Sequence, residues 1–290
     1  HSMLRSGRDD GKVADKGPRL DAAEEVEAAD WFDQSKQPVV ISAEDGIQLH
    51  GWLFDPDCAG AKPHLYAICC HGYSGQPQDM AKYAHRFARL GFTVLVPALR
   101  GHGLSEGRYA GMGWLDRRDL MRWISLIIDS DADARILLQG KSMGAAAVMM
   151  TVGEPDLPRN VVAAVEDCGY ASVGQQFIDC ARSMFHLPKF LAKPIVTTMG
   201  AIARRRAGYG FQEASCVEQL KHATIPMLFI HGGADDFVPS RALDENFDAC
   251  ASIDRQKLLI PSAGHSMSAS TAPVVYWKTV TNFVTRVFGL

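Results

Sequence analysis

Short apolar runs alternate with amphipathic, helix-like segments along most of the 290-residue chain. The first two runs, 38–43 and 47–54, are separated by the turn signal Asp45-Gly46 and are typical of a hairpin. Six further runs cover residues 65–70, 92–96, 136–138, 161–165, 227–230 and 258–260. Strands that are apolar throughout are typical of a parallel sheet covered by helices on both faces. The sequence therefore predicts an α/β fold with a mostly parallel eight-stranded sheet.

One segment, 171–223, interrupts this alternation. It carries helical patterns without a convincing strand, and Ser215 and Glu218 stand at capping-box spacing before its last helix. An insertion that leaves the carboxyl ends of the strands lies over the crevice where such sheets bind ligands, so we expect a small helical cap. The α/β core then comprises residues 18–170 and 224–290.

The amino-terminal residues differ from the rest of the chain. Residues 1–17 are polar and charged, and we expect a tail there. A helix is predicted at 21–32, with Asp21 and Glu24 at capping-box spacing. The first three residues resemble an expression scar, which is compatible with removal of a native targeting signal.

The composition argues against several classes of protein. Lys+Arg 30 against Asp+Glu 33 gives a net charge of −3, which offers no basic surface for nucleic acid. No apolar run is long enough to suggest a membrane span. The 7 cysteines are odd in number and lack metal-site spacing, so we expect no disulfide framework, no zinc site and a cytoplasmic location.

Two Gly-x-Ser-x-Gly sequences, 103–107 and 140–144, compete as nucleophile motifs. A nucleophile elbow needs a strand, a sharp turn with the serine at its tip, and a helix that begins at once. Ser142 follows an apolar run and precedes small, helix-compatible residues, whereas Ser105 is followed by a glycine-rich loop. We therefore predict that Ser142 is the nucleophile.

A serine hydroxyl needs a base to take its proton. Among the 10 histidines, His265 lies on the loop after the last apolar run, which returns to the sheet edge where Ser142 is expected. His71, His102 and His231 each precede a glycine at a strand end, where hydrogen bonding to a turn is the simpler role. His265 is therefore the predicted base.

The base needs a carboxylate to orient it, and three aspartates are candidates. Asp235 and Asp236 follow the run at 227–230, and Asp167 follows the run at 161–165. Each would also be an ordinary turn residue, so the pattern by itself leaves the choice open.

These features resemble the α/β-hydrolases, and within them the serine-aminopeptidase and monoacylglycerol-lipase-like group, over residues 31–290. The resemblance rests on the chain order Ser142, Asp235, His265 and on four short motifs. These are HGYSG at 71–75, RGHGLSEG at 100–107, HGGADDFVP at 231–239 and AGH at 263–265.

The resemblance implies the roles of individual residues. In the family's motif His-Gly-x-x-Asp-x-x-Val-Pro the acid is the fifth residue, which implies Asp235 here. It also implies an oxyanion hole formed by the backbone N–H groups of Tyr73 and Met143. The loop that contains Ser105 would then be a structural loop beside the pocket.

The resemblance implies a serine hydrolase that cleaves carboxylic esters of small molecules through an acyl-enzyme, without a metal or other cofactor. An amidase or small-peptide aminopeptidase with the same triad is the alternative within enzymes. A non-catalytic binding scaffold is a third reading, although such scaffolds usually lack a member of the triad and all three residues are present here.

Lys141, directly before Ser142, has two readings. Because side chains alternate along a strand, we expect Lys141 to point away from the face of Ser142 and to pair with Glu166 or Asp167 on the next strand. In the alternative, it reaches the pocket and favours an acyl group that bears a carboxylate.

Overall fold

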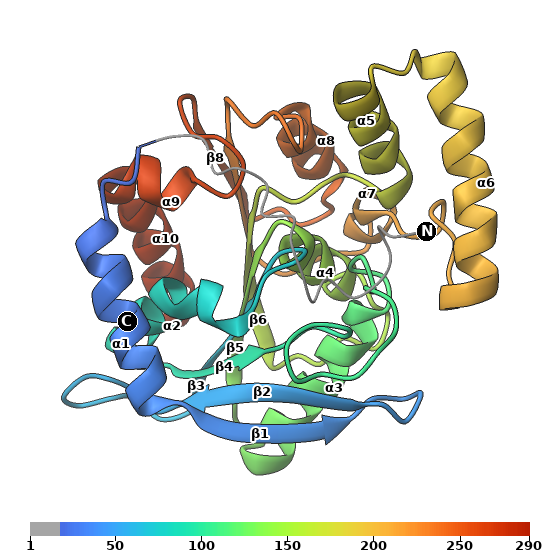
Figure 1. Ribbon diagram of the computed structural model, residues 1–290. Coiled ribbons are helices and arrows are strands. Elements are labelled where there is room, and N and C mark those ends of the chain that lie inside the picture. The colour runs from blue at the N-terminus through green and yellow to red at the C-terminus, as the bar shows by residue number, and fades with distance from the viewer. Residues whose placement is uncertain (1–17) are drawn as a thin grey trace.

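The computed structural model describes residues 18–290, so the expected tail at 1–17 lies outside the described residues. An eight-stranded sheet runs in the order β1-β2-β4-β3-β5-β6-β7-β8 (Figure 1). β1 pairs with β2, and β2 with β4, in antiparallel register, and all later pairings are parallel. The prediction of a mostly parallel eight-stranded sheet is confirmed.

The strands coincide closely with the apolar runs. They are β1 Gln37–Ser42, β2 Gln48–Phe54, β3 Leu65–Cys70, β4 Thr93–Pro97, β5 Arg135–Lys141, β6 Val161–Asp167, β7 Met227–Gly232 and β8 Arg255–Ile260. The helices are α1 Ala22–Ser35, the 3₁₀ helix η1 Pro77–Met80, α2 Ala81–Arg89, α3 Asp116–Ser130, α4 Met143–Thr151, α5 Val173–Phe185, α6 Lys189–Ala207, α7 Cys216–Leu220, α8 Arg241–Ala249, α9 Ser268–Thr271 and α10 Pro273–Phe288.

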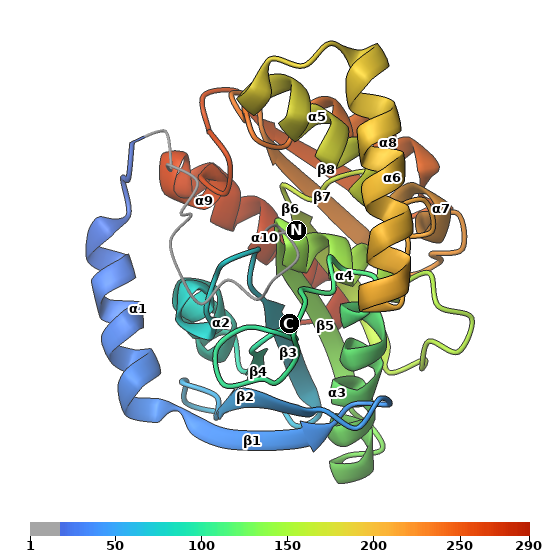
Figure 2. The same cartoon turned by 45° about the vertical axis from the view of Figure 1, so that its right-hand side comes forward.

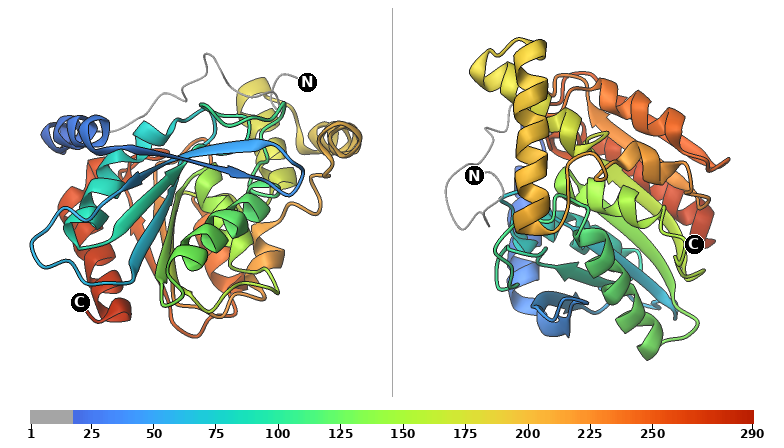
Figure 3. Two further views of the ribbon diagram at one scale, coloured as in Figure 1. Left: turned by 90° about the horizontal axis from the view of Figure 1, so that it is seen from below. Right: turned by 90° about the vertical axis from the view of Figure 1, so that its right-hand side faces the viewer.

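Helices cover both faces of the central strands of the sheet, as Figures 1 and 3 show. On β3, Leu65, Ala67 and Cys69 pack into a core formed with α1, α2 and α10. Ile68 and Cys70 point the other way, into a core formed with α3, α4, α7 and α8. This alternation between two apolar cores is the reason why the strand sequences are apolar throughout.

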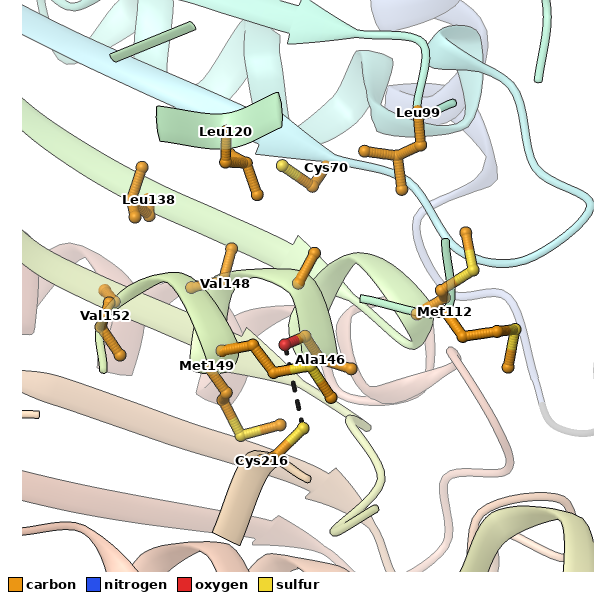
Figure 4. Packing of buried hydrophobic residues seen from close by; sticks show 14 of the residues in the cluster. Cys70, Leu99, Met112, Leu120, Leu138, Ala146, Val148, Met149, Val152 and Cys216 are labelled. Carbon is orange, nitrogen blue, oxygen red and sulfur yellow. Dashed lines mark hydrogen bonds between the residues drawn. The ribbon is translucent and has the colours of Figure 1, made fainter. Parts of the chain in front are cut away.

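Helix α4 lies in the middle of the second core, and all of its residues are buried. Figure 4 shows Ala146, Val148 and Met149 packed between the sheet and neighbouring helices. The thiol of Cys216, at the start of α7, contacts the carbonyl oxygen of Ala146 at 3.8 Å. The amino-terminal end of α4 is therefore held firmly at the carboxyl edge of the parallel strands.

The segment between β6 and β7 contains α5, α6 and α7. Helices α5 and α6 lie side by side at one end of the molecule (Figure 2). Ser215 caps α7, since its Oγ accepts a hydrogen bond from the backbone N–H of Glu218 at 3.3 Å. No helix in the described part of the chain combines the length and the apolar character needed to cross a membrane.

The start of α1 is where the sequence predicted it, but the predicted reason was wrong. Asp21 is the N-cap residue, yet its side chain makes no capping hydrogen bond. Its carboxylate instead accepts a hydrogen bond from the ammonium of Lys82 on α2. A charge-assisted bond to a buried lysine is stronger than a local cap, and it fastens α1 to α2.

Candidate active site

Ser142 occupies a strained turn between β5 and α4. Its backbone has φ 55° and ψ −117°, a conformation that a residue with a Cβ atom rarely adopts. The glycines two positions away are sterically required. A Cβ on Gly140 would lie 2.3 Å from the carbonyl oxygen of Gly144, and a Cβ on Gly144 would lie 2.2 Å from that of Cys70. The turn therefore has the geometry of a nucleophile elbow, which exposes the serine hydroxyl at the edge of the sheet.

Two hydrogen bonds connect Ser142, His265 and Asp235. The Oγ of Ser142 lies 2.8 Å from Nε2 of His265, and Nδ1 of His265 lies 2.7 Å from Oδ2 of Asp235. The other carboxylate oxygen accepts backbone N–H groups from Phe237 at 2.9 Å and Val238 at 2.8 Å. The structure thus brings the three predicted residues together in the order nucleophile, base and acid.

The carboxylate of Asp235 is held in its charged form. Burial alone would raise the pKa of Asp235, but hydrogen bonds from His231 and His265 lower this pKa to about 2. His231 reaches the carboxylate at 3.4 Å and also lies 3.0 Å from the carbonyl oxygen of Val238. The sequence predicted that His231 would bond to a turn, but it did not predict the contact of His231 with the carboxylate of Asp235. The spacing of four residues between His231 and Asp235 was the one signal of that contact in the sequence.

The other acidic candidates do not reach His265. Asp236 is exposed on the same loop as Asp235. Asp167 is buried beneath the elbow, where its Oδ2 accepts the hydroxyl of Tyr276 at 3.0 Å. Of the three aspartates, Asp235 is the one hydrogen-bonded to the imidazole.

Ser105 has structural hydrogen bonds of its own. Its hydroxyl donates to the carbonyl of Ala98 at 2.6 Å and accepts the backbone N–H of His50 at 2.9 Å. These bonds connect the loop after β4 to β2. The second Gly-x-Ser-x-Gly sequence therefore stabilises a loop.

The two predicted oxyanion donors flank the elbow. Met143 is the first residue of α4, and a helix leaves its first N–H groups without an intrahelical acceptor. Tyr73 follows Gly72, whose Cα lies so close to the serine that an added Cβ would be 3.2 Å from Cβ of Ser142. His71 fixes this loop, because its two ring nitrogens contact the carbonyl of Gly72 at 2.8 Å and the N–H of Leu99 at 3.0 Å.

A cavity of about 320 Å³ opens in front of Ser142 and His265. Its walls come from the loop after β3, from α1 and α2, and from the loop that carries His265. Phe237 completes one side, with its ring centroid 5.0 Å from that of His265. The described residues of α5, α6 and α7 contribute no lining residue to this cavity.

Lys141 does not form the salt bridge with Glu166 or Asp167 that the sequence predicted. It lines the same cavity as Ser142, and its ammonium lies 5.9 Å from the ring centroid of Tyr83 on α2. Neither Glu166 nor Asp167 forms an ion pair with it; Glu166 instead accepts the backbone N–H of Gly169 at 3.0 Å. The expected salt bridge was wrong because β5 ends at Lys141, so the strand alternation does not continue through Ser142.

One group of possible metal ligands is found within residues 18–290: Cys168, Asp235 and His265 lie within 4.8 Å of one another. Asp235 and His265 are already hydrogen-bonded to each other. Burial raises the pKa of the Cys168 thiol well above its usual range, which disfavours the thiolate that a metal would require. The arrangement fits proton transfer better than metal binding.

Comparison with known proteins gives one family match. The model of the serine aminopeptidase family S33 matches residues 61–207, which include the elbow but precede Asp235 and His265. Similar proteins include the uncharacterized protein YqkD of Bacillus subtilis, 26% identical over 255 residues that cover 87% of this chain and 81% of YqkD. The uncharacterized protein Rv2307c of Mycobacterium tuberculosis is 29% identical over 230 residues, 79% of this chain and 72% of its own.

Solved structures with this fold include esterases and peptidases. The Pyrococcus furiosus esterase Pf2001 superposes with a TM-score of 0.72 at 19% identity and covers 98% of both chains. The Pyrococcus horikoshii acylaminoacyl peptidase has a TM-score of 0.61 at 15% identity, over 87% of this chain and 42% of that protein. At these identities the similarity concerns the fold.

Proposed function

Because the chain belongs to the serine aminopeptidase family S33 of the α/β-hydrolases, we propose that it is a serine hydrolase that cleaves small carboxylic esters through an acyl-enzyme. One observation carries the proposal: Ser142, His265 and Asp235 form a continuous hydrogen-bonded chain, and Ser142 stands at a strained elbow. The hydrolase class follows from the family, and the ester bond and the catalytic residues are the proposed part.

In the proposed reaction, Nε2 of His265 accepts the proton of the Ser142 hydroxyl while Oγ attacks the ester carbonyl carbon. The carbonyl oxygen becomes an oxyanion, which the N–H groups of Tyr73 and Met143 stabilise, each worth roughly 2.7–4 kcal/mol in comparable enzymes. The protonated His265 then gives its proton to the leaving alcohol as the C–O bond breaks.

The acyl group is next released to water. His265, now neutral, takes a proton from a water molecule whose oxygen attacks the acyl carbon, and the same proton returns to Oγ of Ser142 as the carboxylic acid leaves. Asp235 keeps Nδ1 of His265 protonated throughout, and its carboxylate stabilises the imidazolium in each half of the reaction. Two backbone N–H groups fix the orientation of that carboxylate.

The charges of the cavity support an ester rather than an aminopeptidase substrate. An aminopeptidase must bind the free ammonium group of its substrate, which needs an available carboxylate. Glu25 is already engaged by Lys82 at 3.3 Å and by Arg19 at 3.1 Å. Asp79, the other acidic lining residue, accepts the backbone N–H of Gln76 at 2.9 Å.

We also propose that residues 171–223, with α5, α6 and α7, form a cap next to the core made of 18–170 and 224–290. An isolated antiparallel β-bridge between Ser172 and Ser215 joins the two ends of this segment, which supports the proposal that the segment is one structural unit. In this arrangement the cap would limit the size of substrates that approach from the side of Phe237.

The test is labelling with a fluorophosphonate, which transfers its phosphonyl group to an activated serine with loss of fluoride. Ser142→Ala should abolish both labelling and ester hydrolysis, whereas Ser105→Ala should retain both. A panel of short-chain aryl esters and aminoacyl amides then separates esterase from amidase. Labelling that persists in Ser142→Ala would overturn the assignment, and faster turnover of the amides would favour the peptidase alternative.

A further inference from the structure

Lys141 is a charged group of the cavity that directly precedes Ser142 and that the proposed reaction does not use. Three cationic side chains line the cavity: Arg19, Lys82 and Lys141. Lys82 is buried, binds the carboxylates of Asp21 and Glu25, and also donates to the hydroxyl of Ser270 at 2.9 Å. Lys82 is therefore fully engaged in fastening α1 to α2.

Lys141 has no such partner in the part of the chain that the structure describes. No carboxylate of residues 18–290 lies within 4.0 Å of its ammonium, although Asp167 is its register partner on β6. The side chain is half-buried; its ammonium lies 5.9 Å from the ring centroid of Tyr83 and attracts the carboxyl group of Asp167 without forming an ion pair with it. A partly desolvated ammonium group beside a π-face, with no carboxylate in direct contact, keeps its hydrogen-bond donors available, so an anion in the cavity would be bound favourably.

The position of Lys141 in the chain limits where that anion can be. Neighbouring Cα atoms are about 3.8 Å apart and a lysine side chain extends about 6 Å, so the ammonium lies at most about 12 Å from the Ser142 hydroxyl. A carboxylate that lies between the two groups and binds the ammonium would therefore be up to about 6 Å, or about five bonds, from the scissile carbonyl. The cavity volume of about 320 Å³ is at the small end of the range for ligand pockets, which fits a short substrate.

We propose that Lys141 binds a carboxylate group of the substrate, so that the protein prefers short esters carrying a free carboxylate over neutral esters of the same length. This inference rests on the proposed esterase function and narrows its substrate class. The carboxylate can belong to the acyl half, as in a monoester of a short dicarboxylic acid, or to the alcohol half, as in an ester of a hydroxy acid. Both sources present the same group to Lys141.

The experiment compares matched esters on the full chain by measuring proton release. Ethyl hydrogen glutarate against ethyl pentanoate tests the acyl half, and the butanoic ester of glycolate against ethyl butanoate tests the alcohol half. For at least one pair, Lys141→Met should lower kcat/KM of the acidic ester about tenfold, or about 1.4 kcal/mol, relative to the neutral ester. Lys141→Arg should keep most of the preference, because it keeps the charge.

Lys278→Met is the matched control, since it removes the same charge from an exposed site on α10 outside the cavity. In both pairs it should leave unchanged the ratio of kcat/KM for the acidic ester to kcat/KM for the neutral ester. A second measurement needs no variant: raising sodium chloride from about 0.05 to about 0.5 M should weaken kcat/KM of the preferred acidic ester more than that of its neutral partner.

The outcomes separate this inference from the proposed function. If fluorophosphonate labels Ser142 and the neutral esters are cleaved, but Lys141→Met has unchanged ratios for both pairs, the carboxylate proposal is wrong and the esterase proposal stands. If neither labelling nor ester cleavage occurs, both are wrong. A fall in the ratio for one pair identifies the half of the substrate that carries the carboxylate.

Discussion

Glu166, at the end of β6, is a buried carboxyl group that we expect to make the protein less stable as the pH rises. Its side chain has no exposed surface, Oε2 accepts the N–H of Gly169 at 3.0 Å, and Oε1 has no hydrogen-bond partner among residues 18–290. Burial, opposed by the nearby charge of His231, raises the pKa of Glu166 from 4.5 to about 8. At neutral pH the folded protein therefore holds this group mainly as the neutral acid.

The sign and size of the effect follow from the two pKa values. Between pH 4.5 and about 8 the folded state binds a proton that the unfolded chain has released. The free energy of unfolding therefore decreases with rising pH, by about 1.4 kcal/mol for each pH unit. From about pH 5 to about pH 9 the loss contributed by Glu166 is about 4 kcal/mol. Glu166→Gln is a neutral analogue of the protonated acid and removes this contribution.

The assay is urea unfolding followed by tryptophan fluorescence at about pH 5 and about pH 9. The stability of Glu166→Gln minus that of the wild type should increase by about 4 kcal/mol between the two conditions. Glu27→Gln, at an exposed site on α1, should show no such increase. If the wild type and Glu166→Gln lose stability in parallel over this range, Glu166 does not titrate as described and the reasoning fails.

Further predictions concern catalysis and the elbow. Asp235→Asn should retain the fold but lower kcat by roughly 10⁴, because His265 is no longer held in the productive tautomer. Asp236→Asn should lower kcat far less. A larger fall in Asp236→Asn would refute the assignment of the acid. Gly144→Ala should yield little folded protein, since its methyl group would lie 2.2 Å from a carbonyl oxygen of β3. In Gly174→Ala the added methyl group meets only ordinary contacts, so this control should fold. Circular dichroism can check both. Dialysis against EDTA should leave activity unchanged, and a loss reversed by one divalent metal would contradict a mechanism without a metal.

The elbow could be predicted from the sequence because the residues that it requires are consecutive in the chain, although some of the contacts that require them are with β3. Gly140 and Gly144 are excluded from bearing side chains by atoms of the elbow itself and of the adjoining β3, and the apolar strand before Ser142 is visible as a run. The choice of Asp235 over Asp236 and Asp167 needed the family motif, since all three follow strands that end at the same edge of the sheet.

What could not be predicted depends on contacts between distant residues. Asp21 looked like a local helix cap, but its partner Lys82 lies 61 positions further along the chain. Lys141 lies near Asp167 as expected but forms no salt bridge with it, and it lines the cavity with Ser142 because the alternation rule holds only while the backbone stays extended, and Ser142 has φ 55°. The participation of α1 in the cavity wall has no sequence signature, since it follows from how α1 docks on α2.

That docking has a consequence for how proteins with this architecture can diversify. The family match begins at residue 61, after the whole of α1, and yet Glu25 and Ala29 on α1 line the cavity in front of Ser142. A chain that lacked only the residues before 61 would keep Ser142, Asp235 and His265 but lose one wall of the cavity. Exchange of a single amino-terminal helix, which docks on α2 through a buried ion pair and more exposed ones, is therefore a route by which selection could alter substrate choice while Ser142, Asp235 and His265 remain unchanged.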